Sequence, residues 1–250
     1  MIFDLDDTLV EDIRTVESSY EHVRRCLSGD RDGASWHDMR DAVRMVWRRG
    51  PCYELCVGLG FASSEGLWSM FEGNDPILDE VKDWLPSFRR EAWTAALEIL
   101  GLRDPALISA AGEIFGQAEA RGHPILPGAA ESVRRVSARH RLGLLTNGPS
   151  DVQRHKLEGS GLASHFERVA ISGEMGVGKP DPAAFRHILG SLEVEPHEAV
   201  MIGDNWERDI VGARSSGIPA VWIAWGRPAP AQLEGVTVIE TIEALPGVLD

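Results

Sequence analysis

The second half of the chain alternates short apolar runs with helical patterns, and this alternation limits the folds that the chain can adopt. We expect strands within residues 142–145, 169–171, 199–202 and 220–223, with a further strand at 236–239. Strands that alternate with helices predict a parallel sheet with helices on both faces. The fold class that we predict is therefore α/β, with a doubly wound parallel sheet.

The first ten residues add one more expected strand, and the end of that strand is acidic. The apolar pair Ile2 and Phe3 runs directly into Asp4, Asp6 and Asp7. Buried carboxylates are unfavourable unless they are paired or bound to a metal. One interpretation is a polar turn after a short strand. The other is a carboxylate cluster that holds a hard cation and presents one oxygen as a nucleophile.

The later expected strands also end in polar residues, and this observation separates the two interpretations. In a doubly wound sheet, ligands bind beyond the carboxyl ends of the strands. Four strand ends, or the loops that follow them, carry Asp4 and Asp6, Thr146 and Asn147, Lys179, and Asp204 with Asp209. One edge of one sheet would thus collect carboxylates, a hydroxyl and an ammonium. The sequence therefore predicts a functional site at this edge.

The intervening residues, 11 to 121, show helical periodicity and no convincing strand. Ser35 and Asp38 are spaced as an N-terminal capping arrangement. A long helix is expected from Pro76 to Leu100, with Pro86 as a break or kink. Five of the eight tryptophans fall in this region, and we expect most of them to pack between helices. These features predict a separate all-helical domain.

The charge balance excludes some partners. The formal net charge is −14 and the pI is about 5.0, so nucleic acid and anionic membranes are poor partners for the bulk surface. No apolar run is long enough to span a membrane, and no leader pattern opens the chain. The three cysteines form no disulfide framework, and we expect them to be buried apolar residues. These observations favour a cytoplasmic protein.

Four motifs, in order, resemble those of the haloacid dehalogenase superfamily. They are Asp4-x-Asp6-x-Thr8, the LTNG run at 145–148, the GKPDP run at 178–182, and Gly203-Asp204 with Asp209. The chain is similar to the branch whose helical cap is inserted between the first and second motifs. The resemblance implies a Rossmann-like core at residues 1–10 and 122–250. It also implies an all-helical cap at residues 11–121, which would determine substrate specificity.

The resemblance also implies catalytic roles for residues at the strand ends. Asp4 would be the nucleophile that forms an aspartyl phosphate. Asp6 would be the general acid and base. Thr146 and Lys179 complete the implied catalytic set, and these two residues would bind the phosphoryl group together with Asn147.

Mg²⁺ is the implied cofactor, and it suits a site that is rich in oxygen ligands. The implied ligands are the carboxylates of Asp4 and Asp204 and the backbone carbonyl of Asp6. Asp209 lies five residues beyond Asp204 and would orient a metal-bound water or Lys179 rather than bind the cation directly.

The reaction class depends on Asp6. Dehalogenases of the superfamily lack an acid two residues after the nucleophile, because a halide leaves without a proton. The presence of Asp6 therefore argues against dehalogenation and favours a phosphatase that acts on a small phosphorylated metabolite. A phosphomutase of the same family and a non-catalytic binding protein on the same fold are the alternatives. We expect a monomer or a homodimer.

Overall fold

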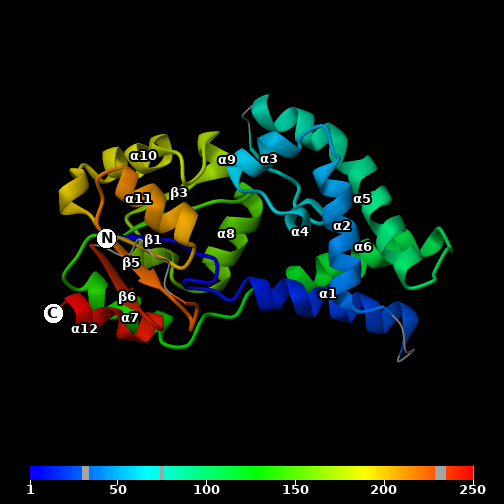
Figure 1. Ribbon diagram of the computed structural model, residues 1–250, viewed down its shortest axis with the longest axis horizontal. Helices are drawn as coiled ribbons and strands as arrows, with labels where there is room; N and C mark the ends of the chain where they lie inside the picture. The colour runs from blue at the N-terminus through cyan, green and yellow to red at the C-terminus, as the bar shows by residue number, and fades with distance from the viewer. Residues whose placement is uncertain (30–33, 74–75, 229–234, 250) are drawn as a thin grey trace.

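The computed structural model describes residues 1–29, 34–73, 76–228 and 235–249, and it contains a sheet unit and a helical unit that lie side by side (Figure 1). The sheet has six strands in the order β3-β2-β1-β4-β5-β6, and every neighbouring pair is parallel. The strands are β1 (Ile2–Phe3), β2 (Gly143–Thr146), β3 (Arg168–Ile171), β4 (Met201–Gly203), β5 (Ala220–Ile223) and β6 (Val236–Ile239). The predicted α/β fold with a parallel sheet is confirmed.

Helices cover both faces of the sheet. Adjacent residues of a strand point to opposite faces. Phe3 accordingly packs with residues of α7 and α12, whereas Ile2 packs with residues of α10 and α11. The helices of the sheet unit are α7 (Ala129–Ser137), α8 (Ser150–Gly159), α9 (Ser172–Met175), α10 (Pro182–Leu192), α11 (Gly212–Ser215) and α12 (Leu245–Leu249). A π-helix, Trp206–Val211, precedes α11.

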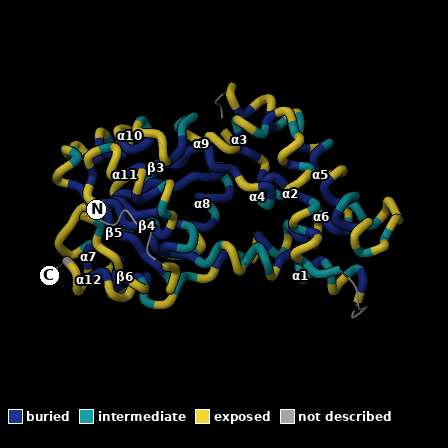
Figure 2. Tube along the Cα trace, in the orientation of Figure 1, coloured by how far each residue is buried: buried dark blue, intermediate teal, exposed yellow. Residues whose placement is uncertain are grey.

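The helical unit has a hydrophobic core of its own. Its helices are α1 (Ile13–Ser28), α2 (Trp36–Arg48), α3 (Tyr53–Leu59), α4 (Ser63–Gly66), α5 (Asp79–Ile99) and α6 (Ala106–Glu119). Trp47 packs against Trp84 and Phe88, with ring centroids 5.0 and 4.9 Å apart, and Trp93 packs against Phe115 at 5.5 Å. These tryptophans therefore pack between helices, as the sequence predicts. Figure 2 shows buried residues along the inner sides of both units.

Local predictions in the helical unit have mixed outcomes. Ser35 and Asp38 form the predicted capping box, because each side chain accepts a hydrogen bond from the other residue's backbone N–H. The predicted long helix is present as α5, and it continues through Pro86, so of the two alternatives at Pro86, a break or a kink, the break is wrong. The prediction that all three cysteines are buried is wrong for Cys26, which lies on an exposed part of α1 beside His22. Within the described ranges, no helix is both long and apolar enough to cross a membrane.

Candidate active site

The site begins with an ion pair between two chain segments that are far apart in the sequence. Asp4 follows β1 directly, and Lys179 reaches it from the loop beyond β3. The Lys179 ammonium donates hydrogen bonds to Asp4 Oδ1 at 2.6 Å and to Asp209 Oδ1 at 2.7 Å. Burial raises the pKa of Asp4 to about 6, even though Lys179 opposes the rise, and Asp209 adds to it. Lys179 therefore holds two carboxylates together in a dry environment.

Asn147 positions the backbone of Lys179. Its side-chain amide donates to the Lys179 carbonyl at 2.8 Å and accepts from the Lys179 N–H at 2.8 Å. Both bonds are buried, so the loop after β3 is tied to the end of β2. Asn147, which the sequence predicts to bind phosphate, thus supports the lysine through its side chain.

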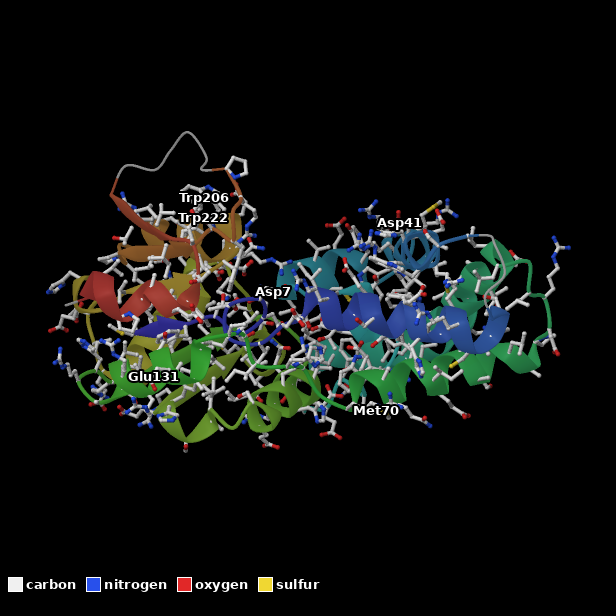
Figure 3. The ribbon with its side chains drawn as sticks, turned by 90° about the horizontal axis from the view of Figure 1, so that it is seen from below. Asp7, Asp41, Met70, Glu131, Trp206 and Trp222 are labelled. Carbon is white, nitrogen blue, oxygen red and sulfur yellow. The ribbon has the colours of Figure 1, made fainter. Side chains whose placement is uncertain are left out.

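Asp204 and Asp209 converge at the end of β4. The Asp209 carboxylate accepts from the Asn205 N–H at 2.9 Å, which brings the π-helix back onto the strand end. A Cβ atom at Gly203 would lie 2.3 Å from Asp209 Oδ2, so this approach requires glycine. The Trp222 indole donates to the Asp204 carbonyl at 2.8 Å, and Trp222 in turn packs against Trp206 (Figure 3). The loop after β4 that carries Asp204 and Asn205, here called the acidic loop, is therefore held from several sides.

Asp4, Asp204 and Asp209 form a carboxylate cluster with an excess of negative charge. One oxygen of each lies within 4.8 Å of the others. Burial raises the pKa of Asp204 to about 8, and Asp4 and Asp209 add to the rise, whereas Arg227 opposes it. Arg227 lies 3.2 Å from Asp204 Oδ2. The donor set of carboxylate oxygens and the uncompensated charge both fit a divalent cation.

Asp6 lies on the side of the site that faces α8. Gln153 on α8 donates to Asp6 Oδ2 at 3.0 Å and to Thr146 Oγ at 2.6 Å. Lys156 on the same helix donates to Asp6 Oδ1 at 2.9 Å. Burial raises the pKa of Asp6 to about 6 against the effect of Lys156, with Asp12 and Asp4 adding to the rise. A carboxyl with this pKa can both give and take a proton near neutral pH.

Asp7 has a structural position at the junction of the two units (Figure 3). Its carboxylate accepts from the backbone N–H groups of Asp12 at 3.0 Å and of Ile13 at 3.2 Å, where α1 begins. A carboxylate at this position satisfies free N–H groups and favours the helix dipole. Asp7 therefore stabilises the start of α1 by local hydrogen bonding.

The helical unit closes against the sheet unit close to the site. The Ser172 hydroxyl donates to the Leu59 carbonyl at 2.6 Å, and Gly60 packs directly on Asn147. Asp151, at the start of α8, accepts from the Ser69 hydroxyl at 2.8 Å and from the Met70 N–H at 2.6 Å.

A cleft of about 450 Å³ opens beside the acidic loop, between the two units. Asp204, Asp7 and Arg227 line it from the sheet unit, and Arg14 lines it from α1. A small molecule in this cleft would therefore meet the carboxylate cluster at Asp204.

The structure brings the sequence-predicted residues together at one edge of the sheet. Their chemical roles stay predictions. Three polar side chains that contact them are not among the sequence-predicted site residues, namely Gln153, Lys156 and Arg227. The first two are three positions apart on an amphipathic helix and share a buried face, which was the available signal.

Three comparisons with known proteins agree with this fold. A family model described as haloacid dehalogenase-like hydrolase matches residues 1–217. A phosphoserine phosphatase from Thermus thermophilus is 38% identical over 230 residues, which cover 90% of this chain and 88% of that protein. The magnesium-bound crystal structure of the HAD hydrolase YfnB from Bacillus subtilis aligns with a TM-score of 0.66 at 21% identity, covering 100% of this chain and 97% of that one.

A second solved structure, a 2-haloacid dehalogenase from Pseudomonas syringae pv. tomato, is 28% identical. It aligns with a TM-score of 0.56 over 99% of this chain and 96% of that one. The chain belongs to the haloacid dehalogenase-like hydrolases, and it is therefore an enzyme of the hydrolase class, as the sequence predicts.

Proposed function

We propose that this chain is a Mg²⁺-dependent phosphomonoester hydrolase that acts through an aspartyl phosphate on Asp4. The observation that carries the proposal is the Asp4 carboxylate, which is held by Lys179 at 2.6 Å, beside Asp204 and two residues before a second carboxyl, Asp6. Phosphoryl transfer requires positioning and charge compensation more than covalent assistance, and this edge of the sheet supplies both.

Asp4, Asp204 and the Asp6 backbone carbonyl would hold the cation, and Asp209 would support Lys179. When bound, Mg²⁺ compensates the charge of the phosphoryl oxygens and orients them. The raised pKa of Asp204 supports this assignment, because a cation would relieve the repulsion among the three carboxylates.

The chain's own residues account for the remaining chemistry. Asp4 Oδ forms a bond to phosphorus while the bond to the leaving oxygen breaks. Asp6, in its protonated form, gives that oxygen a proton. Asp6 then takes a proton from a water molecule whose oxygen attacks phosphorus and releases Asp4. Thr146 and Lys179 bind the phosphoryl oxygens throughout these steps.

Asp6 also supports a phosphate ester over a halide as substrate. The 28% identity to a haloacid dehalogenase would allow either reaction, since a carboxylate nucleophile serves both. A halide departs without a proton, however, whereas an alkoxide requires one. The Asp6 carboxyl, which shares the hydrogen-bond donor Gln153 with Thr146, is therefore useful only for the cleavage of a phosphate ester.

The substrate class is a small phosphorylated metabolite, and phosphoserine is the first candidate. Its support is the 38% identity to a phosphoserine phosphatase over most of both chains.

The helical unit would act as a cap that closes over the site and excludes water. We propose its boundaries at residues 10/11 and 121/122, close to the start of α1 and the end of α6. The cytoplasmic location and the monomeric or dimeric state stay predictions.

The test is phosphate release from a panel of phosphomonoesters that includes phosphoserine, with Mg²⁺ and with a chelator. We expect release that requires Mg²⁺ and that is lost in Asp4→Asn. Conversion of a sugar phosphate to its isomer with little free phosphate would replace the proposal by a phosphomutase. Inactivity over the whole panel would favour a binding protein on this fold.

A further inference from the structure

Lys156 is a buried lysine that belongs to none of the four sequence motifs. Its side chain is 2% exposed. Its ammonium donates to Asp6 Oδ1 at 2.9 Å and to Asp12 Oδ1 at 2.6 Å. A buried lysine requires anionic partners, because desolvation of its charge is unfavourable. Here one partner is the expected proton donor and the other is the residue directly before α1.

Gln153 holds the other oxygen of Asp6. Its side-chain NH₂ group donates one hydrogen bond to Asp6 Oδ2 and one to Thr146 Oγ, at 3.0 and 2.6 Å. Both carboxyl oxygens of Asp6 are thus fixed from α8, which leaves the carboxyl little freedom to rotate. Among the described residues, the buried Gln153 Oε1 has no hydrogen-bond partner. An unpaired buried acceptor is unfavourable for folding, so stability alone does not explain this glutamine.

Asp12 ties Lys156 to the segments that connect the two units. Asp12 precedes α1 on the outgoing segment, and His123 lies on the returning segment after α6. His123 Nε2 is 3.3 Å from Asp12 Oδ1 and 3.5 Å from Glu119 Oε2. The buried carboxyl of Glu65, on α4, also interacts with Lys156. Lys156 therefore contacts the general acid on one side and the connection to the helical unit on the other.

We propose that Gln153 and Lys156 are positioning residues that aim the Asp6 carboxyl at the leaving oxygen, and that Asp12 anchors Lys156 to the connection with the helical unit. This inference rests on the proposed function of Asp6. As the proton leaves Asp6, the ammonium of Lys156 stabilises the carboxylate that remains. Neither Gln153 nor Lys156 touches the substrate in this role.

The role predicts a dependence on the leaving group. A serine-type alkoxide is strongly basic and requires the proton of Asp6, whereas a nitrophenolate departs without one. The value of kcat/KM reports the steps up to departure of the leaving group. A residue that positions only the acid therefore affects kcat/KM for an alkyl phosphate far more than for p-nitrophenyl phosphate.

The experiment compares kcat/KM for phosphoserine, or for the best alkyl phosphate of the panel, with kcat/KM for p-nitrophenyl phosphate. We expect Lys156→Met to lower the alkyl value by about 10²-fold or more and the aryl value by less than about fivefold. Lys156→Arg, which keeps a cation, should recover much of the alkyl value. Arg154→Met, on the exposed side of the same helix, is the matched control and should leave both values within about twofold of wild type.

Gln153→Leu is the second variant, and it changes no charge, so it stays testable if Lys156→Met does not fold. It should show the same preferential loss with the alkyl phosphate. Equal losses with both substrates, in whichever of the two variants folds, would overturn the positioning role. Failure of the proposed function is distinguishable, because the wild-type protein would then hydrolyse neither ester, or Asp4→Asn would hydrolyse both.

Discussion

Lys179 Nζ lies 2.6 Å from Asp4 Oδ1, although 175 positions separate the two residues in the chain. Burial alone would lower the pKa of Lys179, but Asp209 and Asp4 raise it above its usual value. Lys179 is therefore a permanent cation at neutral pH, and the charge balance of the site depends on it.

Replacement of Lys179 by methionine should remove this balance. We expect kcat/KM to fall by at least about 10²-fold, because a fixed charge at the phosphoryl group is lost. The free energy of unfolding should fall by about 3–5 kcal/mol, because two buried carboxylates lose their partner. Steady-state kinetics and urea unfolding measure the two effects. Wild-type activity in a folded variant would remove Lys179 from the site.

Binding of Mg²⁺ should stabilise the folded protein in the absence of any substrate. A ligand that binds only the folded state at 100 times its Kd adds about 2.7 kcal/mol. We expect a higher Tm on addition of Mg²⁺, and a much smaller rise in Asp204→Asn. Glu131→Gln is the matched control, since Glu131 is an exposed acid of the sheet unit that pairs with Arg134, and it should respond as wild type does. Identical responses of the two variants would contradict the cation site.

Glu65 should make stability depend on pH. Burial raises the pKa of Glu65 to about 8, and Asp6 and Asp12 add to the rise. Lys156 opposes the rise, and so does the hydrogen bond that the carboxylate accepts from the Ala62 N–H at 2.7 Å. The folded state therefore binds this proton more tightly than the unfolded state does. The contribution to stability is fully present below the ordinary pKa of 4.5 and is lost as pH rises towards 8.

The corresponding variant is Glu65→Gln, which keeps an acceptor for the Ala62 N–H. Relative to wild type, its free energy of unfolding should increase between pH 5 and pH 8.5 by on the order of 2–4 kcal/mol. Urea unfolding at several pH values measures the difference. A difference that does not change with pH would mean that Glu65 ionises normally in the fold.

A single methyl group at Gly60 should separate the two units near the site. Gly60 has a φ of +74°, and an added Cβ would lie 2.5 Å from Asn147 Nδ2. We expect Gly60→Ala to lower the free energy of unfolding by about 1–3 kcal/mol and to lower kcat/KM, because Asn147 supports Lys179. Gly101→Ala, at a similar φ of +71° but with open space around its Cβ, is the control, and it should show only the smaller cost of backbone strain. Equal effects of the two variants would mean that the units do not meet at Gly60 in solution.

The residues at the strand ends could be predicted because their signal is local. Each lies directly after an apolar run, or in the loop that follows it, and a parallel sheet brings those ends to one edge. Asp4, Thr146 and Asp204 were found in this way. The separate helical unit followed from periodicity over a long stretch without strand patterns.

The spacing of Gln153 and Lys156 indicates a shared helix face, but the partners of these two residues could not be predicted because they depend on tertiary packing. Lys156 is 150 positions from Asp6 and 144 from Asp12, and a lysine on an amphipathic helix normally faces water. The π-helix that brings Asp209 onto Gly203 has no sequence pattern of its own. The residue type of Cys26 predicts burial, but its position on α1 is exposed to solvent.

The most direct test of the account is to trap the covalent intermediate. Protein that is turning over substrate with Mg²⁺ is quenched and reduced with borotritide, which converts an aspartyl phosphate to tritiated homoserine. We predict label in the N-terminal peptide, at position 4, only when substrate and Mg²⁺ are both present, and none in Asp4→Asn. Label at another carboxylate, or undiminished phosphate release by Asp4→Asn, would contradict the assignment of Asp4 as the nucleophile.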